Sequence, residues 1–331
     1  MKNHYILILL SLFIVVFTVT CRKVPVTDLR FNRDSLALSV GDTGILIVTV
    51  LPEDATYKKL SWSSSNSAVA IIKDGMILAL NEGTATISIA TSDGNKTASC
   101  ALTVNKKVEG EPEMIIVKGG TLPMGCTDND CWDDGREEPL HQVTLSSFRI
   151  SKYPITQKQW RSIMGSNHSH YEGDNLPVVQ VNWAEVQEFI SKLNDVTGKD
   201  YRLPTEAEWE FAARGGTKCK GYKFSGSNDI DAVAWYRHNS GRVLRPVGTK
   251  MPNELGIYDM SGNVWEWCND WYGPYTRGAK VDPQGLEQGS IRVGRGGGGT
   301  TDTVSCRVST RTELHPNFRG PYVGFRVAIS I

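Results

Sequence analysis

The sequence predicts two folded domains, an all-β immunoglobulin-like sandwich followed by a loop-rich α+β domain. Residues 24–104 alternate between apolar and polar side chains over short segments, a pattern typical of strands. Only 6 of the 32 glycines and one of the nine tryptophans precede residue 111. Glycine permits tight turns and tryptophan fills large apolar spaces, so the second domain should be rich in turns and aromatic packing.

The composition is that of a folded chain without a nucleic-acid partner. Lysine plus arginine number 36, as do aspartate plus glutamate, which gives a net charge of zero over 331 residues. A nucleic-acid binder would carry a basic stripe, so this class is excluded. Hydrophobic residues make up 40% and charged residues 22%, which excludes a disordered chain.

The N-terminus has the features of a targeting segment. Lys2 precedes an apolar run over residues 5–19, shorter than the ~20 residues that a membrane-spanning helix needs. The run leads to Cys21 and resembles a bacterial lipoprotein signal, although Thr18 stands where leucine is usual. We expect residues 1–20 to be removed and residues 21–23 to form a lipidated N-terminus in the cell envelope, on either membrane face. The alternative is a simple signal peptide with an incidental cysteine.

The first domain, residues 24–104, has turn signals such as Asp74-Gly75 between its strand segments and no helical stretch. Cys100 shares one face of the last strand with Leu102 and is expected to be a core thiol. The segment with Trp62 before Ser-Ser-Asn, the Asp-Gly hairpin and the Gly-Thr-Ala-Thr-Ile strand at 83–87 resembles the bacterial immunoglobulin-like group 2 family. That resemblance implies a stalk without chemistry. The polar residues 105–112 should form a linker that proteases cut first.

Two helices are predicted in the second domain, residues 113–331. Asn182 can cap a helix that starts at Trp183 and ends before Gly198. Thr205 and Glu208 form the sequence signature of a capping box, and glycines 215 and 216 stop that helix. The glutamates at 206, 208 and 210 are therefore interpreted as structural rather than as paired catalytic acids.

Six motifs in order relate this domain to a known family. Together they resemble the sulfatase-modifying-factor family, which is the formylglycine-generating enzyme and its relatives, with a loop-rich fold like that of C-type lectins. The resemblance covers some 215 residues. The motifs are Gly119-Gly120 to Met124-Gly125, PLHQV at 139–143, RLPTEAEWEFAARGG at 202–216, NELGIYDMSGNVWEW at 253–267, RVGRGG at 292–297 and VGFR at 323–326.

The resemblance implies a copper site, which this sequence only half preserves. Catalytic members oxidise a substrate cysteine to formylglycine with O2 and a Cu(I) ion held by two cysteines five positions apart. Cys306 occupies the second position, whereas Thr301 replaces the first and Gly298 replaces a usual serine. A hydroxyl is a hard, neutral donor and cannot replace a soft thiolate at Cu(I). Trp267 corresponds to a tryptophan that lines the family's active pocket.

The remaining cysteines leave several pairings open. Cys268 could substitute as a second copper thiolate, could form a disulfide with Cys306, or could be an unrelated buried thiol. Cys126 and Cys131 could close a small loop. Six cysteines after Cys21 allow 15 complete pairings, and the sequence does not choose between them.

The resemblance also implies structural calcium. One site maps onto Gly262, Val264 and Glu266, and Asn239 is a candidate for a second site. Oxygen ligands suit Ca²⁺, and a looped domain gains from such a clip. The alternative for Glu266 is a salt bridge with an arginine.

Two functions follow as expectations. The first is a non-catalytic or divergent envelope lipoprotein that binds a peptide, glycan or protein partner. The second is a formylglycine-generating oxidase that acts on exported sulfatases. The missing thiolate at position 301 favours the first.

Overall fold

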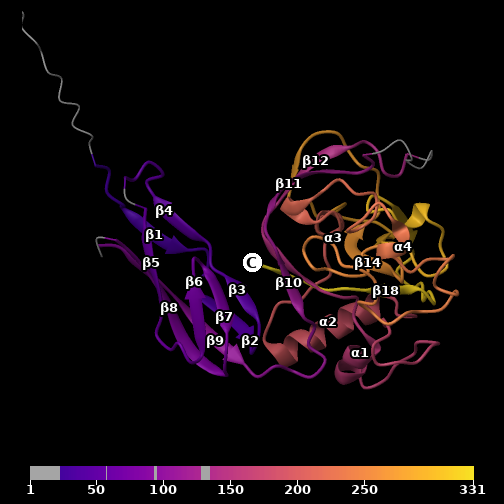
Figure 1. The fold of residues 1–331 in the computed structure, drawn as a ribbon, viewed down its shortest axis with the longest axis horizontal. Coiled ribbons are helices and arrows are strands. Elements are labelled where there is room, and N and C mark those ends of the chain that lie inside the picture. Colours follow the sequence, from indigo (N-terminus) through magenta and orange to yellow (C-terminus); the bar gives the residue numbers. More distant parts are fainter. Residues whose placement is uncertain (1–22, 57, 93–94, 128–134) are drawn as a thin grey trace, which may run out of the picture.

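The computed structural model describes residues 23–56, 58–92, 95–127 and 135–331. It consists of two domains that lie side by side (Figure 1), with the N-terminal strands in indigo and purple. Cys21 and Cys131 lie outside the described residues, as do the other residues of the targeting segment up to position 22. Within the described ranges, no helix is long and apolar enough to cross a bilayer.

The N-terminal domain is the predicted sandwich. One sheet has the order β2-β9-β8-β5, a second has the order β3-β7-β6, and β1 pairs with β4. The strands enclose an apolar core in which Cys100 is 1% exposed, as predicted for a core thiol. The strands are β1 (Asp28–Phe31), β2 (Ser35–Ser39), β3 (Thr43–Ile45), β4 (Val48–Leu51), β5 (Leu60–Ser64), β6 (Ala70–Lys73), β7 (Met76–Ala79), β8 (Gly83–Thr91) and β9 (Thr97–Asn105).

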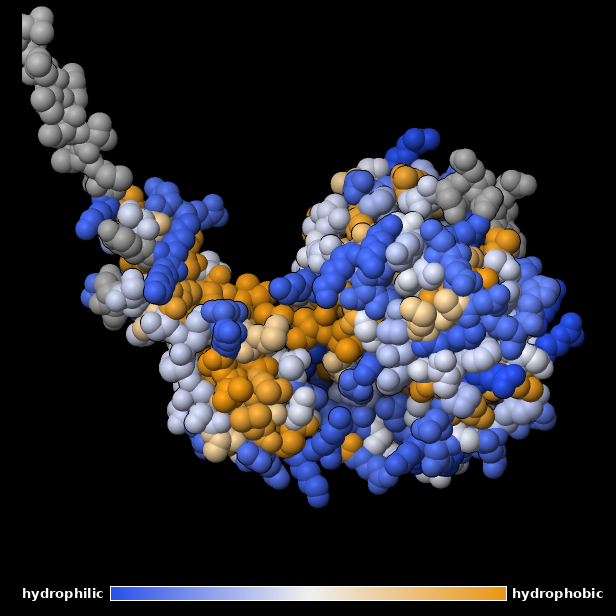
Figure 2. Space-filling view, viewed as in Figure 1, coloured by the Kyte–Doolittle hydropathy of each residue, from blue (hydrophilic) through white to orange (hydrophobic). Residues whose placement is uncertain are grey.

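The hairpin between β6 and β7 shows why the turn sequence matters. Asp74 and Gly75 both have positive φ, 49° and 84°, as a tight two-residue turn requires. A Cβ at position 75 would lie 2.9 Å from the carbonyl oxygen of Leu46. Beyond this hairpin, Ile71 and Leu78 are cross-strand partners with exposed side chains on the outer face of the β3-β7-β6 sheet. Figure 2 shows an apolar patch on the surface of the N-terminal domain.

The second domain has three small sheets and few helices, as the glycine distribution predicts. The sheets have the orders β10-β13-β19, β11-β12-β15 and β17-β16-β14-β18. The strands are β10 (Met114–Val117), β11 (Gly120–Met124), β12 (His141–Leu145), β13 (Phe148–Ser151), β14 (Trp265–Trp271), β15 (Lys280–Val281), β16 (Arg292–Arg295), β17 (Arg311–Leu314), β18 (Val323–Phe325) and β19 (Ala328–Ser330).

Both predicted helices are confirmed with their caps. The helix α2 (Trp183–Thr197) starts at a capping box of Asn182 and Glu185, and Gly198 ends it in the left-handed conformation. The helix α3 (Glu206–Ala213) starts at the predicted box of Thr205 and Glu208. The other helical elements are α1 (Gln157–Met164), α4 (Ile230–Val233) and the 3-10 turns η1 (Gly216–Lys218) and η2 (Val304–Cys306).

The segment between the domains is tied down rather than free. Glu111 is 6% exposed and accepts hydrogen bonds from Lys199 Nζ at 2.5 Å and from Tyr201 Oη at 2.9 Å. Lys199 also pairs with Asp42 of the N-terminal domain, and Ser39 Oγ donates to Glu111 at 3.1 Å. A buried ion network therefore joins the two domains through the linker.

Candidate functional site

The two positions of the expected copper pair lie next to each other. Thr301 Oγ1, just before η2, is 3.8 Å from Sγ of Cys306, the last residue of η2. Cys306 is fully buried, and its thiol is 3.6 Å from the carbonyl oxygen of Asp302. Burial raises the pKa of Cys306 to about 12. The residue is therefore a neutral thiol at physiological pH, and these side chains do not fit a two-thiolate Cu(I) site.

The glycine run before η2 fixes the position of that thiol. Gly297 has φ +75°, and a Cβ there would lie 2.9 Å from Cys306 Sγ. Gly298 differs, because a Cβ at this position would meet only ordinary contacts, 3.4 Å from Tyr322 and 3.6 Å from Trp265 Cδ1. The backbone at position 298 could therefore carry the serine that is usual in the family. The glycine found here removes that side chain without requiring a different backbone conformation.

The tryptophan beside this loop is not the expected one. Trp267 is fully buried in an apolar cluster with Phe325, and its Nε1 donates to the carbonyl oxygen of Val181 at 3.1 Å. The described structure therefore gives Trp267 a core role. Trp265, two residues earlier, has its indole next to Gly298. Side chains alternate along a strand, so neighbours two apart share a face, and the motif alone did not distinguish them.

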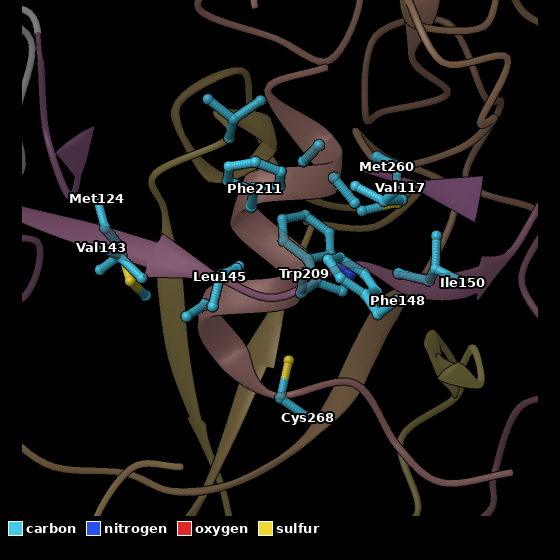
Figure 3. Packing of buried hydrophobic residues seen from close by; sticks show 14 of the residues in the cluster. Val117, Met124, Val143, Leu145, Phe148, Ile150, Trp209, Phe211, Met260 and Cys268 are labelled. Carbon is cyan, nitrogen blue, oxygen red and sulfur yellow. The ribbon is translucent and has the colours of Figure 1, made fainter. Parts of the chain in front are cut away.

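Cys268 does not join Cys306. Both are free thiols, and each belongs to a separate apolar cluster. Cys268 packs below Trp209 in the cluster shown in Figure 3, whereas Cys306 packs with Phe224 and Tyr236. The structure thus matches the interpretation of two unrelated buried thiols and lacks the disulfide. Cys126 is disulfide-bonded.

Glu266 forms the salt bridge that was the alternative to calcium. Arg326 donates to both carboxylate oxygens, at 2.6 and 2.8 Å, and Trp209 Nε1 donates at 2.7 Å. Glu266 and Arg326 are both 0% exposed. Arg326 neutralises this carboxylate, so Glu266 does not need a cation to be buried.

Asp259, which the sequence motif did not single out, lies in the same region. It is 3% exposed, and burial raises its pKa to about 6, while the charge of Glu266 adds to that rise. Asn239 is engaged in its own turn, because its amide donates to Asp231 and Ala234 and its oxygen accepts from Tyr236 N. Over the described ranges, no group of three or more histidine, cysteine or acidic side chains is arranged to hold a metal ion.

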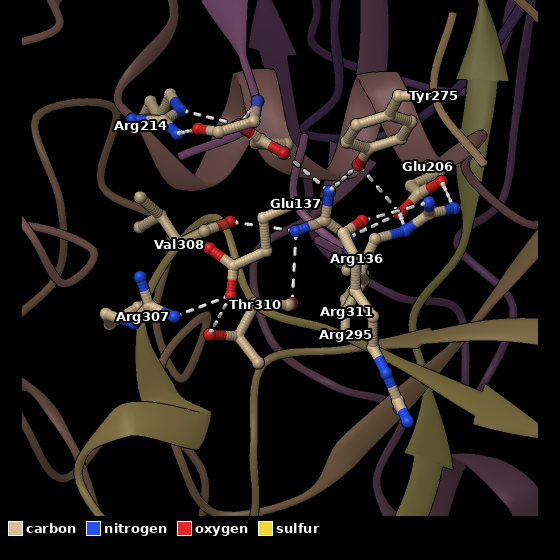
Figure 4. A network of polar contacts seen from close by, with 12 residues as sticks. Arg136, Glu137, Glu206, Arg214, Tyr275, Arg295, Arg307, Val308, Thr310 and Arg311 are labelled. Carbon is tan, nitrogen blue, oxygen red and sulfur yellow. Dashed lines mark hydrogen bonds and ion pairs between the residues drawn. The ribbon is translucent and has the colours of Figure 1, made fainter. Parts of the chain in front are cut away.

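The glutamates of α3 hold buried arginines. Glu206 accepts from Arg295 Nε at 2.9 Å and from Arg311 Nη2 at 2.7 Å, and Glu210 accepts from Arg295 and Arg214 (Figure 4). Arg295 also donates to the carbonyl oxygens of Val308 and Thr310. This network supports the structural interpretation of these acids and ties β16, β17 and the loop before β17 to α3.

A cavity of about 240 Å³ lies beside that network, and no sequence motif predicted it. It is bounded by the start of α3, the end of β14 and the loop over residues 273–286. Asp270 lines it, is 4% exposed, and has a pKa that burial raises to about 7. None of the residues from 296 to 306 lines this cavity.

The fold and these motifs define a loop-rich domain of the formylglycine-generating-enzyme type carried behind an immunoglobulin-like domain. Residues 100–331 match the model of the sulfatase-modifying factor enzyme 1-like domain, and residues 25–102 match that of the bacterial Ig-like domain (group 2). The chain therefore belongs to the sulfatase-modifying factor enzyme 1-like family.

Relatives in this family carry different names. The chain is 31% identical over 306 residues to the chaperone protein LppX of Paenibacillus barcinonensis, covering 77% of this chain and 98% of that protein. It is 35% identical over 284 residues to the formylglycine-generating enzyme of Streptomyces coelicolor, covering 65% of this chain and 88% of that enzyme.

Solved structures agree on the fold. Treponema denticola variable protein 1 has a TM-score of 0.61 at 30% identity, with 66% of this chain and 95% of that chain covered. PvdO from Pseudomonas aeruginosa has a TM-score of 0.58 at 27% identity, with 67% and 95% covered. The predicted loop-rich fold is thus confirmed.

Proposed function

We propose that this chain is a non-catalytic member of its family, an exported envelope lipoprotein that binds a protein or peptide partner. One observation carries the proposal. Thr301 stands 3.8 Å from Cys306 Sγ, where the catalytic chemistry needs a second thiolate. The single thiol is buried and its pKa is raised to about 12, so neither copper binding nor thiolate reactivity is supported.

The relatives support a binding role. A protein named as a chaperone matches this chain over 98% of its own length, which makes partner binding a natural use of the fold. A glycan is the alternative to a peptide or protein partner for such an envelope protein. The formylglycine-generating enzymes among the relatives support the second candidate, a residual oxidase.

The test is a Cu(I) titration of the purified chain against a competing chelator, followed by mass spectrometry of a Cys-x-Pro-x-Arg peptide incubated with copper and O2. We expect weak copper binding and no aldehyde. The variant Thr301→Cys should gain tight binding, because two thiolates on one ion at ~2.3 Å each can span the distance that Thr301 and Cys306 leave. Tight binding and peptide conversion by the wild type would overturn the proposal in favour of the oxidase.

The lipid anchor is tested separately. Metabolic labelling with a fatty-acid probe should mark the wild-type chain through Cys21, because an N-terminal cysteine after a short apolar run is the acceptor in such signals. Cys21→Ala should lose the label, and Cys219→Ala is the matched control. Equal labelling of Cys21→Ala would exclude lipidation.

We also propose a structural calcium site in the C-terminal domain. Two buried carboxylates, Asp259 and Glu266, face one arginine charge, Arg326, and the backbone carbonyl groups of Gly262 and Val264 lie on the same loop. A cation would offset the remaining negative charge. Added calcium should raise the melting temperature of the wild type and not that of Asp259→Asn. An unchanged melting temperature of the wild type would remove the proposal.

A further inference from the structure

The cavity beside the start of α3 has the properties of a binding site that does not depend on the fate of Cys306. Its volume of about 240 Å³ is below the range of sites for drug-sized ligands, so it suits a small group. Its polar lining includes Glu206, Asp270, Arg311, Lys280 and His141, and its apolar lining includes Met124 and Leu286.

Glu206 and Asp270, the two acids that line the cavity, differ in their hydrogen-bond partners. Glu206 is surrounded by Arg295, Arg311 and Tyr275, all of which donate to its carboxylate. Asp270 accepts one hydrogen bond, from the backbone N of Glu206 at 2.8 Å. Within the described part of the chain, no lysine, arginine or histidine side chain forms an ion pair with Asp270.

Arg311 and Arg292 lie near Asp270 but donate their hydrogen bonds to other acceptors. Arg311 donates to Glu206 and to the carbonyl oxygen of Gly273. Burial lowers the pKa of Arg292, and the charge of Asp270 partly offsets this effect. The guanidinium of Arg292 nevertheless lies 3.3 Å from the centroid of the Trp271 ring and donates to the carbonyl oxygen of Asn269. Arg311 and Lys280 also line the cavity, but within the described residues neither forms an ion pair with Asp270, so this buried carboxylate has no direct cationic partner. A buried unpaired charge is costly, so the site favours a positive ligand or a proton.

We propose that this cavity binds a primary ammonium group on a short alkyl stem, with Asp270 as its ion-pair partner. The ammonium group supplies the missing positive charge at Asp270. The stem lies along Met124, Ala207 and Leu286, where burial of each CH2 group is favourable. A free amine and the lysine side chain of a peptide share this chemistry.

The experiment is a ligand-observed NMR titration of the full-length chain at pH 8, above the pKa of Asp270. The probes are n-butylammonium chloride and 1-butanol, which have similar stems and differ in charge. We expect butylammonium to bind at least tenfold more tightly than butanol. A lysine-containing peptide compared with the same peptide bearing Nε-acetyllysine then separates a lysine side chain from a free amine as the source.

Three variants decide the assignment. Asp270→Asn keeps an acceptor for the Glu206 backbone N–H and removes the charge, so it should lose at least tenfold in butylammonium affinity. Leu286→Trp alters a half-exposed wall residue and should block the cavity, which provides a second test if Asp270→Asn fails to fold. Glu287→Gln removes a neighbouring carboxylate that does not line the cavity and should bind as the wild type does.

Three outcomes would overturn the proposal. They are equal binding of butanol and butylammonium, full affinity in Asp270→Asn or Leu286→Trp, and an equal loss in Glu287→Gln. None of these outcomes depends on the copper titration. The proposed ammonium site and the proposed loss of copper binding at Cys306 are therefore tested independently.

Discussion

The two domains of this chain are stabilised in different ways. The core of the N-terminal sandwich consists of side chains such as Leu38, Ile77 and Ile87, and strand pairing satisfies its backbone. The C-terminal domain buries Arg295 and Arg326 with their carboxylate partners. Its long loops leave carbonyl groups unpaired in sheets, and arginine side chains donate to them. A fold with little regular structure thus uses buried arginines where a sandwich uses strands.

The largest expected effect tests this contrast in the C-terminal domain. Arg295→Met leaves Glu206 and Glu210 buried with fewer partners and should lower the free energy of unfolding by about 3–5 kcal/mol. Urea unfolding followed by tryptophan fluorescence measures this change. The matched control is Arg161→Met, whose exposed pair with Asp174 should contribute less than about 1 kcal/mol. Equal losses in the two variants would contradict the contrast.

A cavity in the sandwich should have a comparable, slightly smaller effect. Ile87→Ala removes apolar contacts from a fully buried strand position and should cost about 3 kcal/mol. Fluorescence of Trp62, which is the only tryptophan of this domain and packs against the same core, should report the change. Replacement of exposed Ile71 by alanine should change stability by less than about 0.5 kcal/mol.

The junction between the domains is expected to be intermediate. Lys199→Met removes the cation that Asp42 and Glu111 share, with a cost of about 2 kcal/mol because both carboxylates keep other hydrogen bonds and Asp42 is partly open to solvent. The linker should then be released, and trypsin should cut after Lys107 several-fold faster than in the wild type. Lys192→Met, whose pair with Glu188 is exposed, is the control. Unchanged cleavage would mean that the ion network does not hold the linker.

The smallest effect concerns pH. The pKa of Asp270 is raised to about 7 in the folded chain from about 3.9 unfolded, so the folded state binds a proton more tightly. Its contribution to stability is complete below about pH 4 and is lost as the pH rises through about 7. Between pH 6 and pH 8 the wild type should lose about 1.4 kcal/mol from this group, and Asp270→Asn should not. Parallel pH profiles of the two proteins would contradict this assignment.

The sequence predicted the elements whose signals are local. Asn182, Gly198 and Thr205 mark helix ends through their own backbone preferences, and Asp74-Gly75 marks a hairpin, so these positions were identified correctly. The helix α1 was not predicted, although Thr156 and Gln159 provide the same capping-box signature at its start.

The site was harder to predict because its contacts are long-range. Thr301 and Cys306 are five residues apart, and their closeness followed from the motif. Trp265 and Trp267 share one face of β14, so which of them lies next to Gly298 depends on long-range packing that no residue count decides. Asp270 meets Glu206 from 64 positions away, so nothing near it in the chain announced the cavity.

The fastening of Glu111 to Lys199 has a mechanical consequence. A flexible tether lets a domain sample a broad volume, whereas a fixed joint holds it at one height and one orientation. Asp42 of the sandwich forms an ion pair with the same lysine, so the sandwich is fixed to the C-terminal domain and acts as a rigid arm. The local concentration that such an arm presents to a partner is high at one distance and falls steeply at others. For the partner binding proposed above, the length of the arm would decide which partners the C-terminal domain can reach.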